Sequence, residues 1–309
     1  MTKKRPRRPF YQKNNKIILS NSREVRQFLS IFADGILYMM LLKSISEWIK
    51  DRPRHGLFTF THDDVVEAFP EMTTGAMSRA LTREVNKGRI MSPLRGFYVI
   101  ITDEYALRGT VPQAVYLDQM MQHLERKYYV ALLNAAEYHG AAHQAPMSFC
   151  VMIEPPSMRN KKTDKYNTLY FCKSHIPEAY VERRQTWNGY INISSPELTA
   201  VDLLTYQDKI GGVTRAATVL AELAEKLDFG RLDELFVKSV PVTSLQRLGY
   251  ILDVVLEEQA VANSLYRLLK ETGQTIQAVP LKSGKPADSC ELNARWKVIV
   301  NQDIEIDDL

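Results

Sequence analysis

Cysteine and long apolar runs are both scarce in this sequence. Its three cysteines, Cys150, Cys172 and Cys290, are widely spaced and odd in number, so they form neither a disulfide framework nor a CxxC pair. We expect them to be buried, reduced thiols. The longest apolar window, Ile31 to Leu42, includes an aspartate and a glycine and falls short of the roughly 20 residues that a membrane-spanning helix needs. We therefore expect no membrane partner.

Recognisable catalytic motifs are also missing. The sequence has no GxxxxGK[ST] phosphate loop, no GxSxG nucleophile elbow and no cluster of acidic metal ligands. His139 and His143 have the i,i+4 spacing of two metal ligands on a helix, but Gly140 stands where a zinc protease has its glutamate. We predict structural histidines there, no metal or cofactor, and no enzymatic activity.

The length and the charge distribution of the chain indicate its domain organisation. A chain of 309 residues that is 45% hydrophobic and 25% charged has room for two globular domains. Its net charge of +4 hides an asymmetry, because residues 1–26 carry nine lysines and arginines against one glutamate, whereas the other 283 residues carry 31 basic and 35 acidic groups. Such a basic arm is attracted to polyanions, and a solubilising tail is the alternative. The arm lacks the apolar core of a secretory signal, so we expect a cytoplasmic protein.

Local signals predict two helices after the arm. An apolar helical pattern covers Phe28 to Ile49, and the proline and glycine of "DRPRHG", residues 51–56, end it. The extended piece "LFTF" leads to a second helix, which Thr61 caps and Pro70 closes.

A third helix and a hairpin follow. The helix begins at Thr73 or Thr74 and stops at Gly88, and "IMSPLRGFYVII" forms two strands around a turn at residues 92–96. Three helices followed by a β-hairpin are typical of a winged helix-turn-helix. We assign this domain to residues 27–104.

The third helix has an apolar side and a basic side. At 100° per residue, Met77, Leu81 and Val85 fall together and would fix the helix against the other two. Arg79, Arg83 and Asn86 fall almost opposite, with Gly75 and Thr82 beside them. We expect these side chains, together with Thr74 at the start of the helix, to contact DNA. Guanidinium and amide groups can bond guanine and adenine edges bidentately in the major groove. A merely solvated charged face is the alternative.

The hairpin and the arm would add contacts around the helix. Arg95, at the tip of the hairpin, is expected to enter the minor groove, and Lys87 and Arg89, near its base, to contact phosphates. We predict further phosphate contacts from the basic residues of the arm, Lys3, Lys4, Arg5, Arg7 and Arg8. Helix order, hairpin and arm together favour DNA binding.

The rest of the chain has a different pattern. After a linker at residues 105–113, one helix is predicted from Val115 to Tyr138, and β-like runs follow at residues 148–153, 168–173 and 189–194. Helical patterns then extend from Ser195 to about Glu271, and two more β-like runs, "IQAVPL" and "RWKVIV", come last. The chain is thus predicted to be α+β, with a mixed α+β domain over residues 114–309 after the winged helix-turn-helix.

Several ordered motifs carry a resemblance. They are "GRIMSPLRGFYVI" in the hairpin, then "YYVALLNAAEYHGAAHQAP", "SSPELTAVDLL", "GGVTRAATVLAELAEKLD", "QRLGYIL" and "RWKVIVNQDIEIDDL". From about Phe58 onward the chain resembles the AbiEi family, the antitoxins of bacterial abortive-infection (type IV) toxin–antitoxin systems. The basic arm and the pattern from Phe28 to Ile49 make this N-terminus longer than the minimal family pattern.

The resemblance implies both a function and partners. The winged helix would bind inverted repeats in double-stranded DNA of its own promoter and repress it. The C-terminal domain would help to neutralise a nucleotidyltransferase-like toxin, commonly without a stable complex. Our candidates for this antitoxicity are Tyr128, Tyr129, His139, His143, Arg159, Lys161, Lys162 and Lys165.

Two other functions remain open from the sequence. A ligand-responsive winged-helix regulator would bind a metabolite through its second domain. An enzyme that acts on nucleic acid or nucleotides would use the winged helix only for targeting, although the sequence shows no catalytic set for it.

Overall fold

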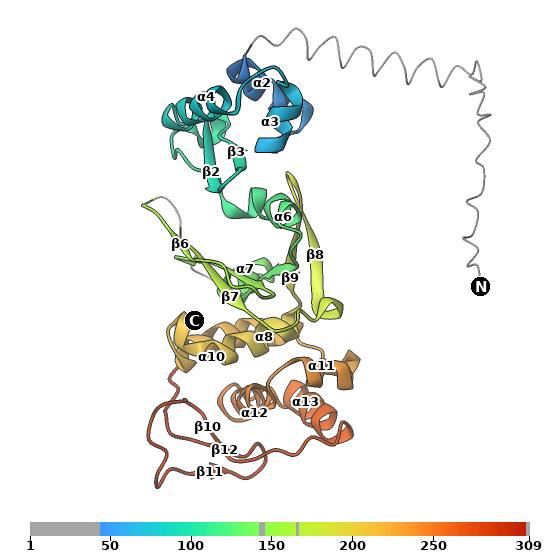
Figure 1. Cartoon of the computed structure of the whole chain (residues 1–309). Helices are drawn as coiled ribbons and strands as arrows, with labels where there is room; N and C mark the ends of the chain where they lie inside the picture. Colours follow the sequence, from blue (N-terminus) through green and yellow to red (C-terminus); the bar gives the residue numbers. More distant parts are fainter. Residues whose placement is uncertain (1–43, 142–145, 165–166, 307–309) are drawn as a thin grey trace, which may run out of the picture.

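The computed structural model describes residues 44–141, 146–164 and 167–306, and it confirms the predicted mixed α+β class. Elements follow one another along the molecule in chain order (Figure 1): helices on a small sheet, a larger sheet, a layer of helices and a final group of short strands. The basic arm and most of the apolar pattern from Phe28 to Ile49 lie outside the described residues.

The N-terminal unit, residues 44–100, packs helices on a small antiparallel sheet. Its helices are α2 (Ile45–Asp51), the 3-10 helix η1 (Arg52–His55), α3 (His62–Ala68) and α4 (Thr74–Asn86). Its strands, in the order β1-β3-β2, are β1 (Thr59–Thr61), β3 (Phe97–Ile100) and β2 (Ile90–Leu94).

The helix ends follow from the local sequence. Thr61 and Asp64 exchange hydrogen bonds in a capping box at the start of α3, as the predicted cap requires. Thr73 accepts a hydrogen bond from the Ala76 backbone amide and caps α4. Gly88 follows α4 with φ of 65°, a left-handed conformation that suits glycine at a helix end.

Strand β3 belongs to two cores at once. On one face, Ile100 and the partly buried Tyr98 pack with α2 and α4 in the core of the N-terminal unit. On the other face, Phe97 and Val99 pack with α6 (Gln113–His123) and the larger sheet. Alternate side chains of a strand point to opposite faces, so this short strand joins the two parts of the chain.

The predicted linker, residues 105–113, contributes to the second of these cores. Tyr105 lies in the short helix α5 (Asp103–Ala106), and both Tyr105 and Val111 are buried with Phe97 and Val99. The division of the chain at these residues stays a prediction.

The larger sheet has six strands in the order β6-β7-β5-β4-β9-β8, of which β4–β9 and β5–β7 are parallel pairs and the others antiparallel. The strands are β4 (Tyr128–Val130), β5 (Phe149–Ile153), β6 (Lys161–Lys162), β7 (Asn167–Cys172), β8 (Val181–Thr186) and β9 (Gly189–Ser194). The three predicted runs form β5, β7 and β9, whereas β4, β6 and β8 were not predicted.

The single helix predicted from Val115 to Tyr138 is wrong. Strand β4 separates α6 from α7 (Leu132–Tyr138), after a turn in which Glu125 has φ of 52°. The aromatic and β-branched run of β4 pairs with β5 on one side and β9 on the other. Its side chains are buried on both faces of the sheet, so tertiary burial overrides the helical periodicity of its neighbours.

Helices cover the face of the sheet that is turned away from the N-terminal unit. They are α7, α8 (Pro196–Thr205), α9 (Gln207–Ile210), α10 (Val213–Leu223), α11 (Glu234–Ser239), α12 (Val242–Tyr250) and α13 (Gln259–Glu271), with the short turns η2 (Glu178–Tyr180), η3 (Ala224–Lys226) and η4 (Phe229–Arg231) and the π-helix η5 (Ile251–Val255). A small sheet in the order β10-β12-β11 closes the far end: β10 (Val279–Pro280), β12 (Val298–Ile299) and β11 (Leu292–Asn293).

The predictions that concern a membrane-spanning helix and the burial of the cysteines differ in their outcome. In the described ranges, no helix combines the length and the apolar character needed to cross a bilayer. Cys150 is buried as expected, and its burial raises the pKa of the thiol to about 12. Cys172 is exposed and Cys290 is half-buried, so the expectation of buried thiols is correct for one cysteine only.

Gly249→Ala should destabilise the protein, because Gly249 in α12 faces the ring of the buried Trp296. An added Cβ would lie 2.0 Å from that ring, and such overpacking lowers the free energy of unfolding by about 1–3 kcal/mol. Gly75→Ala in α4 is the control, because its Cβ would meet nothing nearer than a guanidinium nitrogen at 3.8 Å. Urea unfolding of the two variants checks this, and equal stability would contradict the close packing of α12 on Trp296.

Candidate nucleic-acid interface

Helix α4 has one buried side and one exposed side. Met77 and Leu81 are 2% and 1% exposed and pack against α2 and β2 in the core of the N-terminal unit. The residues predicted to contact DNA are all exposed: Thr74, Gly75, Arg79, Thr82, Arg83 and Asn86. The structure therefore leaves the whole set exposed on one helix, with Thr74 in its first turn and the others on its outer side.

The two arginines of this outer side have no partner among the described residues: neither guanidinium makes a hydrogen bond or ion pair there. The Arg79 side chain lies back over the first turn of α4. A Cβ added at Gly75 would be 3.8 Å from the Nη1 atom of Arg79. Arg83 lies one turn further along the same helix. Two cations thus follow the outer side of α4 with their donors available to an external ligand.

The inner side of α4 differs from the prediction at Val85. Val85, predicted to face inward, is 36% exposed, and Glu84 is buried in its place. The Glu84 carboxylate accepts hydrogen bonds from Lys87 at 3.2 Å and from Arg89 at 3.0 Å. Arg89 also donates to the Ser46 hydroxyl of α2. Because its charge is neutralised on both oxygens, the glutamate is tolerated at this apolar boundary.

The contact of Lys87 and Arg89 with phosphates stays a prediction, but the structure gives both side chains an internal partner as well. Both side chains are bonded to Glu84, and Arg89 also ties the end of α4 to Ser46 of α2, although both remain partly exposed. Burial alone would raise the pKa of Glu84, but the hydrogen bonds from Arg89 and Lys87 outweigh it and lower the pKa. Their first role is therefore internal.

The hairpin turn is fixed rather than free. Gly96 adopts φ of 80°, and its carbonyl accepts a hydrogen bond from the His62 amide at the start of α3. The Phe97 ring meets His123 of α6, with 5.7 Å between the ring centres. Arg95 projects from this turn and is exposed, as predicted. The arm residues Lys3, Lys4, Arg5, Arg7 and Arg8 lie outside the described residues.

Three of the residues proposed for antitoxicity are buried, which makes their predicted surface role wrong. Tyr128 and Tyr129 donate hydrogen bonds to Asp118 and Asp202, and His139 Nε2 donates to the Ser194 carbonyl at 2.7 Å. Burial raises the pKa of both tyrosines and lowers that of His139. They cannot contact a partner in this conformation.

Asp202 and Lys173 form a buried charge pair beneath Tyr129 that was not predicted from the sequence. Asp202 of α8 is 1% exposed and lies 3.6 Å from the amine of Lys173. Desolvation raises the pKa of this carboxyl, although Lys173 and Tyr129 oppose the shift. His143 lies outside the described residues, and within those residues no three histidine, cysteine or acidic side chains are grouped to hold a metal ion.

The basic candidates remain on the surface. Arg159, Lys161 and Lys162 are exposed on and beside β6, the outer strand of the large sheet, while Lys165 lies outside the described residues.

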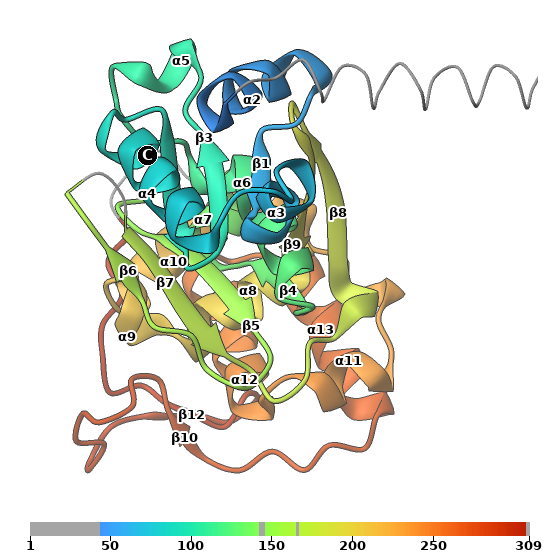
Figure 2. The same cartoon turned by 45° about the horizontal axis from the view of Figure 1, so that its top comes forward.

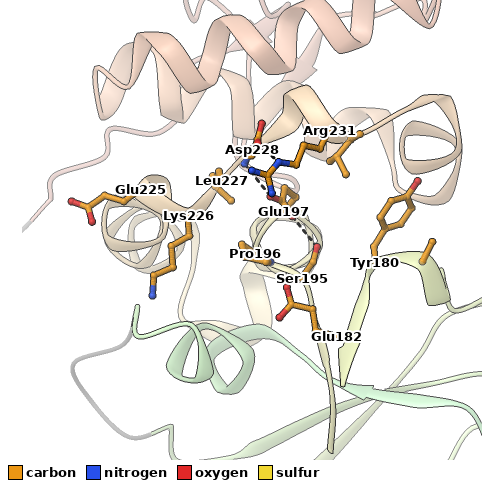
Figure 3. A pocket seen from close by; sticks show the side chains of 12 residues that line it. Tyr180, Glu182, Ser195, Pro196, Glu197, Glu225, Lys226, Leu227, Asp228 and Arg231 are labelled. Carbon is orange, nitrogen blue, oxygen red and sulfur yellow. Dashed lines mark hydrogen bonds and ion pairs between the residues drawn. The ribbon is translucent and has the colours of Figure 1, made fainter. Parts of the chain in front are cut away.

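A cavity of about 650 Å³ opens beside the first turn of α8 (Figure 3). Its lining is Ala179, Tyr180, Glu182, Ser195, Pro196, Glu197, Glu225, Lys226, Leu227, Asp228, Arg231 and Leu232. The Glu197 carboxylate at its centre accepts hydrogen bonds from the Ser195 hydroxyl and the Asp228 amide, and Arg231 pairs with Asp228. Most of its polar groups therefore satisfy one another.

Comparison with protein families identifies the C-terminal part. Residues 129–254 match the model of the AbiEi antitoxin C-terminal domain. The chain carries an AbiEi antitoxin domain. The resemblance drawn from the sequence motifs is thereby confirmed over these residues.

Structural comparison supports the fold over a longer stretch. The crystal structure of the RV2827C protein from Mycobacterium tuberculosis aligns with 82% of this chain and 90% of its own, with a TM-score of 0.59 and 15% identity. This likeness shows a shared fold alone. An antigenic nucleotidyltransferase-like protein from Paracoccidioides brasiliensis aligns over 50% of this chain and 90% of its own, with 9% identity and a TM-score of only 0.30, too low to indicate a common fold. Comparison with curated proteins gives no match.

The AbiEi domain covers the centre of the molecule. Its match begins at the second residue of β4 and ends within η5, so it includes the cavity beside α8 and the buried pair of Asp202 and Lys173. Helix α4 and the hairpin lie before it, and the small sheet from β10 to β12 lies after it.

Glu84→Gln should lower the free energy of unfolding at neutral pH, and the loss should become smaller in acid. A group whose pKa is lowered by folding stabilises the protein above its ordinary pKa, and this contribution disappears as the pH falls through the folded value. Because Lys87 and Arg89 are partly exposed, we expect a loss of only about 1 kcal/mol in the free energy of unfolding at pH 7. Urea unfolding of both proteins at pH 7 and pH 3.5 measures it. A difference that persists unchanged at pH 3.5 would contradict the ionic role of Glu84.

Tyr129→Phe should destabilise the AbiEi domain without removing any surface group. The change deletes the hydroxyl that donates to Asp202 at 2.7 Å, and an underbonded buried carboxylate lowers the free energy of unfolding by about 1–3 kcal/mol. Tyr190→Phe, at a half-exposed position on β9, is the control. Thermal melting and toxin neutralisation are measured together. If Tyr129→Phe abolished neutralisation at unchanged stability, the tyrosine would have a direct role after all.

Proposed function

We propose that this protein is the DNA-binding antitoxin of a toxin–antitoxin system, with a winged helix-turn-helix in its N-terminal unit. The order of helices and strands from α2 to β3 supports the winged-helix assignment, because α3 and α4 are consecutive helices and β2 and β3 form the hairpin that follows them. In this motif the second of the two helices enters the major groove of DNA. Here that helix is α4.

The free outer side of α4 is the observation on which the proposal depends. Arg79, Arg83 and Asn86 are exposed, while Met77 and Leu81 anchor the opposite side of the helix in the core. Arginine matches the O6 and N7 acceptors of guanine, and asparagine matches the N6 and N7 groups of adenine. We assign base contacts to these three residues and assign Thr82 a supporting role.

Other cations would contact the backbone. Arg95 on the fixed turn of the hairpin is assigned to the minor groove. The arm residues Lys3, Lys4, Arg5, Arg7 and Arg8 are assigned to phosphates, which increase affinity without specifying sequence. Lys87 and Arg89 retain partial exposure and can reach a phosphate only in addition to their bonds with Glu84.

The AbiEi domain supports the second half of the proposal. We propose that the protein acts in the cytoplasm without enzymatic activity, represses its own promoter through inverted repeats, and neutralises a nucleotidyltransferase-like toxin through the AbiEi domain. An antitoxin that also controls transcription needs both a DNA-reading unit and an antitoxin domain in one chain, and we assign these two roles to the N-terminal unit and the AbiEi domain.

Arg83→Ala should weaken binding to the promoter DNA by roughly 1–3 kcal/mol and relax the sequence preference, because a base contact is lost. Fluorescence anisotropy with the DNA upstream of the gene, and with a scrambled duplex of equal length, measures both effects.

Arg267→Ala is the matched control for this prediction, because Arg267 is an exposed arginine of α13 near the other end of the molecule. It should leave both affinities unchanged. An equal loss for Arg83→Ala on promoter and scrambled DNA would mean that Arg83 contacts only phosphates, and no loss at all would remove α4 from the interface.

A further inference from the structure

We propose that the cavity beside α8 is the place where the AbiEi domain contacts the toxin, and that it receives an arginine side chain of that protein. The arginine would belong to the surface with which a nucleotidyltransferase-like toxin holds the phosphates of its substrate. The inference rests on the proposed function, which names the toxin but assigns no surface of the AbiEi domain to it.

The cavity is large enough to take long side chains of a partner. Its volume of about 650 Å³ lies within the range of roughly 300–1,000 Å³ that is typical of ligand-binding pockets. Its walls come from η2 and the start of β8, from the first turn of α8, and from residues 225–232 (Figure 3). All three segments lie within the residues that match the AbiEi domain.

A buried carboxylate without a counter-cation lies at the centre of the cavity. Glu197 is 9% exposed and makes no ion pair with another described residue. Its two oxygens accept hydrogen bonds of 3.0 Å from neutral groups, the Ser195 hydroxyl and the Asp228 amide. The first turn of a helix favours a carboxylate by about 0.3–1 kcal/mol, which helps to explain its presence in α8. Buried charges are normally paired, so a cation that enters the cavity would complete this site.

The other charged groups of the lining leave an excess of negative charge. Four carboxylates face two cations there. Asp228 and Glu182 each pair with an arginine of this chain, and the Lys226 amine donates a hydrogen bond to the backbone carbonyl that follows α7. Glu225 is exposed at the rim and has no partner among the described residues. Two carboxylates, one at the centre and one at the rim, are therefore available to a cationic ligand.

Arginine suits this lining better than lysine does. A guanidinium group is planar, donates a fork of hydrogen bonds to carboxylates and stacks on aromatic rings. Tyr180 contributes such a ring to the wall. Its hydroxyl donates to Asp233 at 2.9 Å, and its ring packs edge-on against Phe236 with 4.9 Å between the ring centres. The aromatic wall is thus fixed before a ligand binds, which lowers the entropic cost of binding.

The charge of the cavity also discriminates between kinds of partner. Carboxylates repel the phosphates of DNA and RNA, so the cavity does not suit nucleic acid. An enzyme that transfers nucleotides needs basic side chains to hold substrate phosphates, and this part of a toxin complements an acidic cavity. An arginine held by Glu197 is no longer available to a nucleotide phosphate. The contact would therefore inhibit the toxin directly.

The cavity and the DNA-reading helix lie on different sides of the molecule. Glu182 lies on β8, and α11 begins just after the last residue of the lining, Leu232. In Figure 1 and Figure 2 alike, β8 and α11 lie on the side away from α4. A toxin bound at the cavity would therefore leave α4 free to bind DNA.

The test measures how the full-length protein binds the purified toxin encoded beside its gene. Glu197→Gln/Glu225→Gln removes two negative charges from the cavity at almost unchanged side-chain size. Asp288→Asn/Glu291→Gln is the matched control, because both residues are exposed between β10 and β11, far from the cavity (Figure 1). Thermal melting checks that the variants are folded. Glu225→Gln alone, at an exposed position, replaces the double variant if that variant is unstable.

Fluorescence anisotropy of labelled toxin at about 50 mM and about 300 mM salt gives the affinities, and growth of cells that express the toxin gives neutralisation. We expect the double variant to weaken binding at low salt by about tenfold or more, Glu225→Gln alone by about threefold, and neutralisation to fall in parallel. The control should behave as wild type. A mixture of the four ribonucleoside triphosphates should compete with the antitoxin for the toxin.

Other results would overturn the inference in distinguishable ways. Growth rescue by wild type without measurable binding, or unchanged affinity in the double variant, would show that the cavity does not hold the toxin, and would leave the proposed function standing. Binding that nucleotides do not displace would reject the assignment to the phosphate-binding surface. Failure of wild type to rescue growth would reject the proposed antitoxin function and this inference together.

Discussion

The burial of both faces of β3 is the constraint on which the arrangement of this molecule depends. Tyr98 and Ile100 face the helices of the N-terminal unit, and Phe97 and Val99 face α6 and the large sheet. A hairpin of a winged helix that stood alone would leave the second of these faces to water. Because four consecutive residues supply two cores, the N-terminal unit cannot turn relative to the AbiEi domain without exposing Phe97 and Val99. Each fully buried side chain of this kind contributes about 1.5–3 kcal/mol.

The second constraint is a buried charge. Glu84 lies on the inner side of α4 and needs two cations, which Lys87 and Arg89 supply from the residues immediately after the helix. This arrangement sorts the basic residues of the N-terminal unit into two groups. Lys87 and Arg89 are used within the fold, whereas Arg79 and Arg83 have no described partner. The difference depends on the direction of each side chain from α4 and not on residue type, so net charge alone would have assigned all four to DNA.

Local chemistry explains which features the sequence could predict. The caps at Thr61 and Thr73, the end of α4 at Gly88 and the strand at residues 149–153 depend on neighbouring residues, and the structure has each of them. Strand β4 depends on partners at residues 149–153 and 189–194, and no local period reveals such distant pairing. Val85 and Glu84 flank Leu81 on the helical wheel, and which of the two is buried depends on the ion pairs of Glu84 with residues beyond α4. The burial of Tyr128, Tyr129 and His139 was hidden for the same reason.

Because the two cores are joined, the segment matched by the AbiEi family shares one of its hydrophobic cores with residues outside the match. The family match begins inside β4, yet Tyr128 and Val130 of that strand pack in the same core as Phe97, Tyr105 and Val111. A fragment cut at residue 114 would lose these three side chains and leave the apolar face of the sheet beside α6 partly open to water. The family match therefore covers a segment of the chain but not a closed hydrophobic core. Since the core behind α4 and the core of the large sheet share strand β3, the outer side of α4 and the surfaces of the AbiEi domain keep a fixed orientation relative to each other.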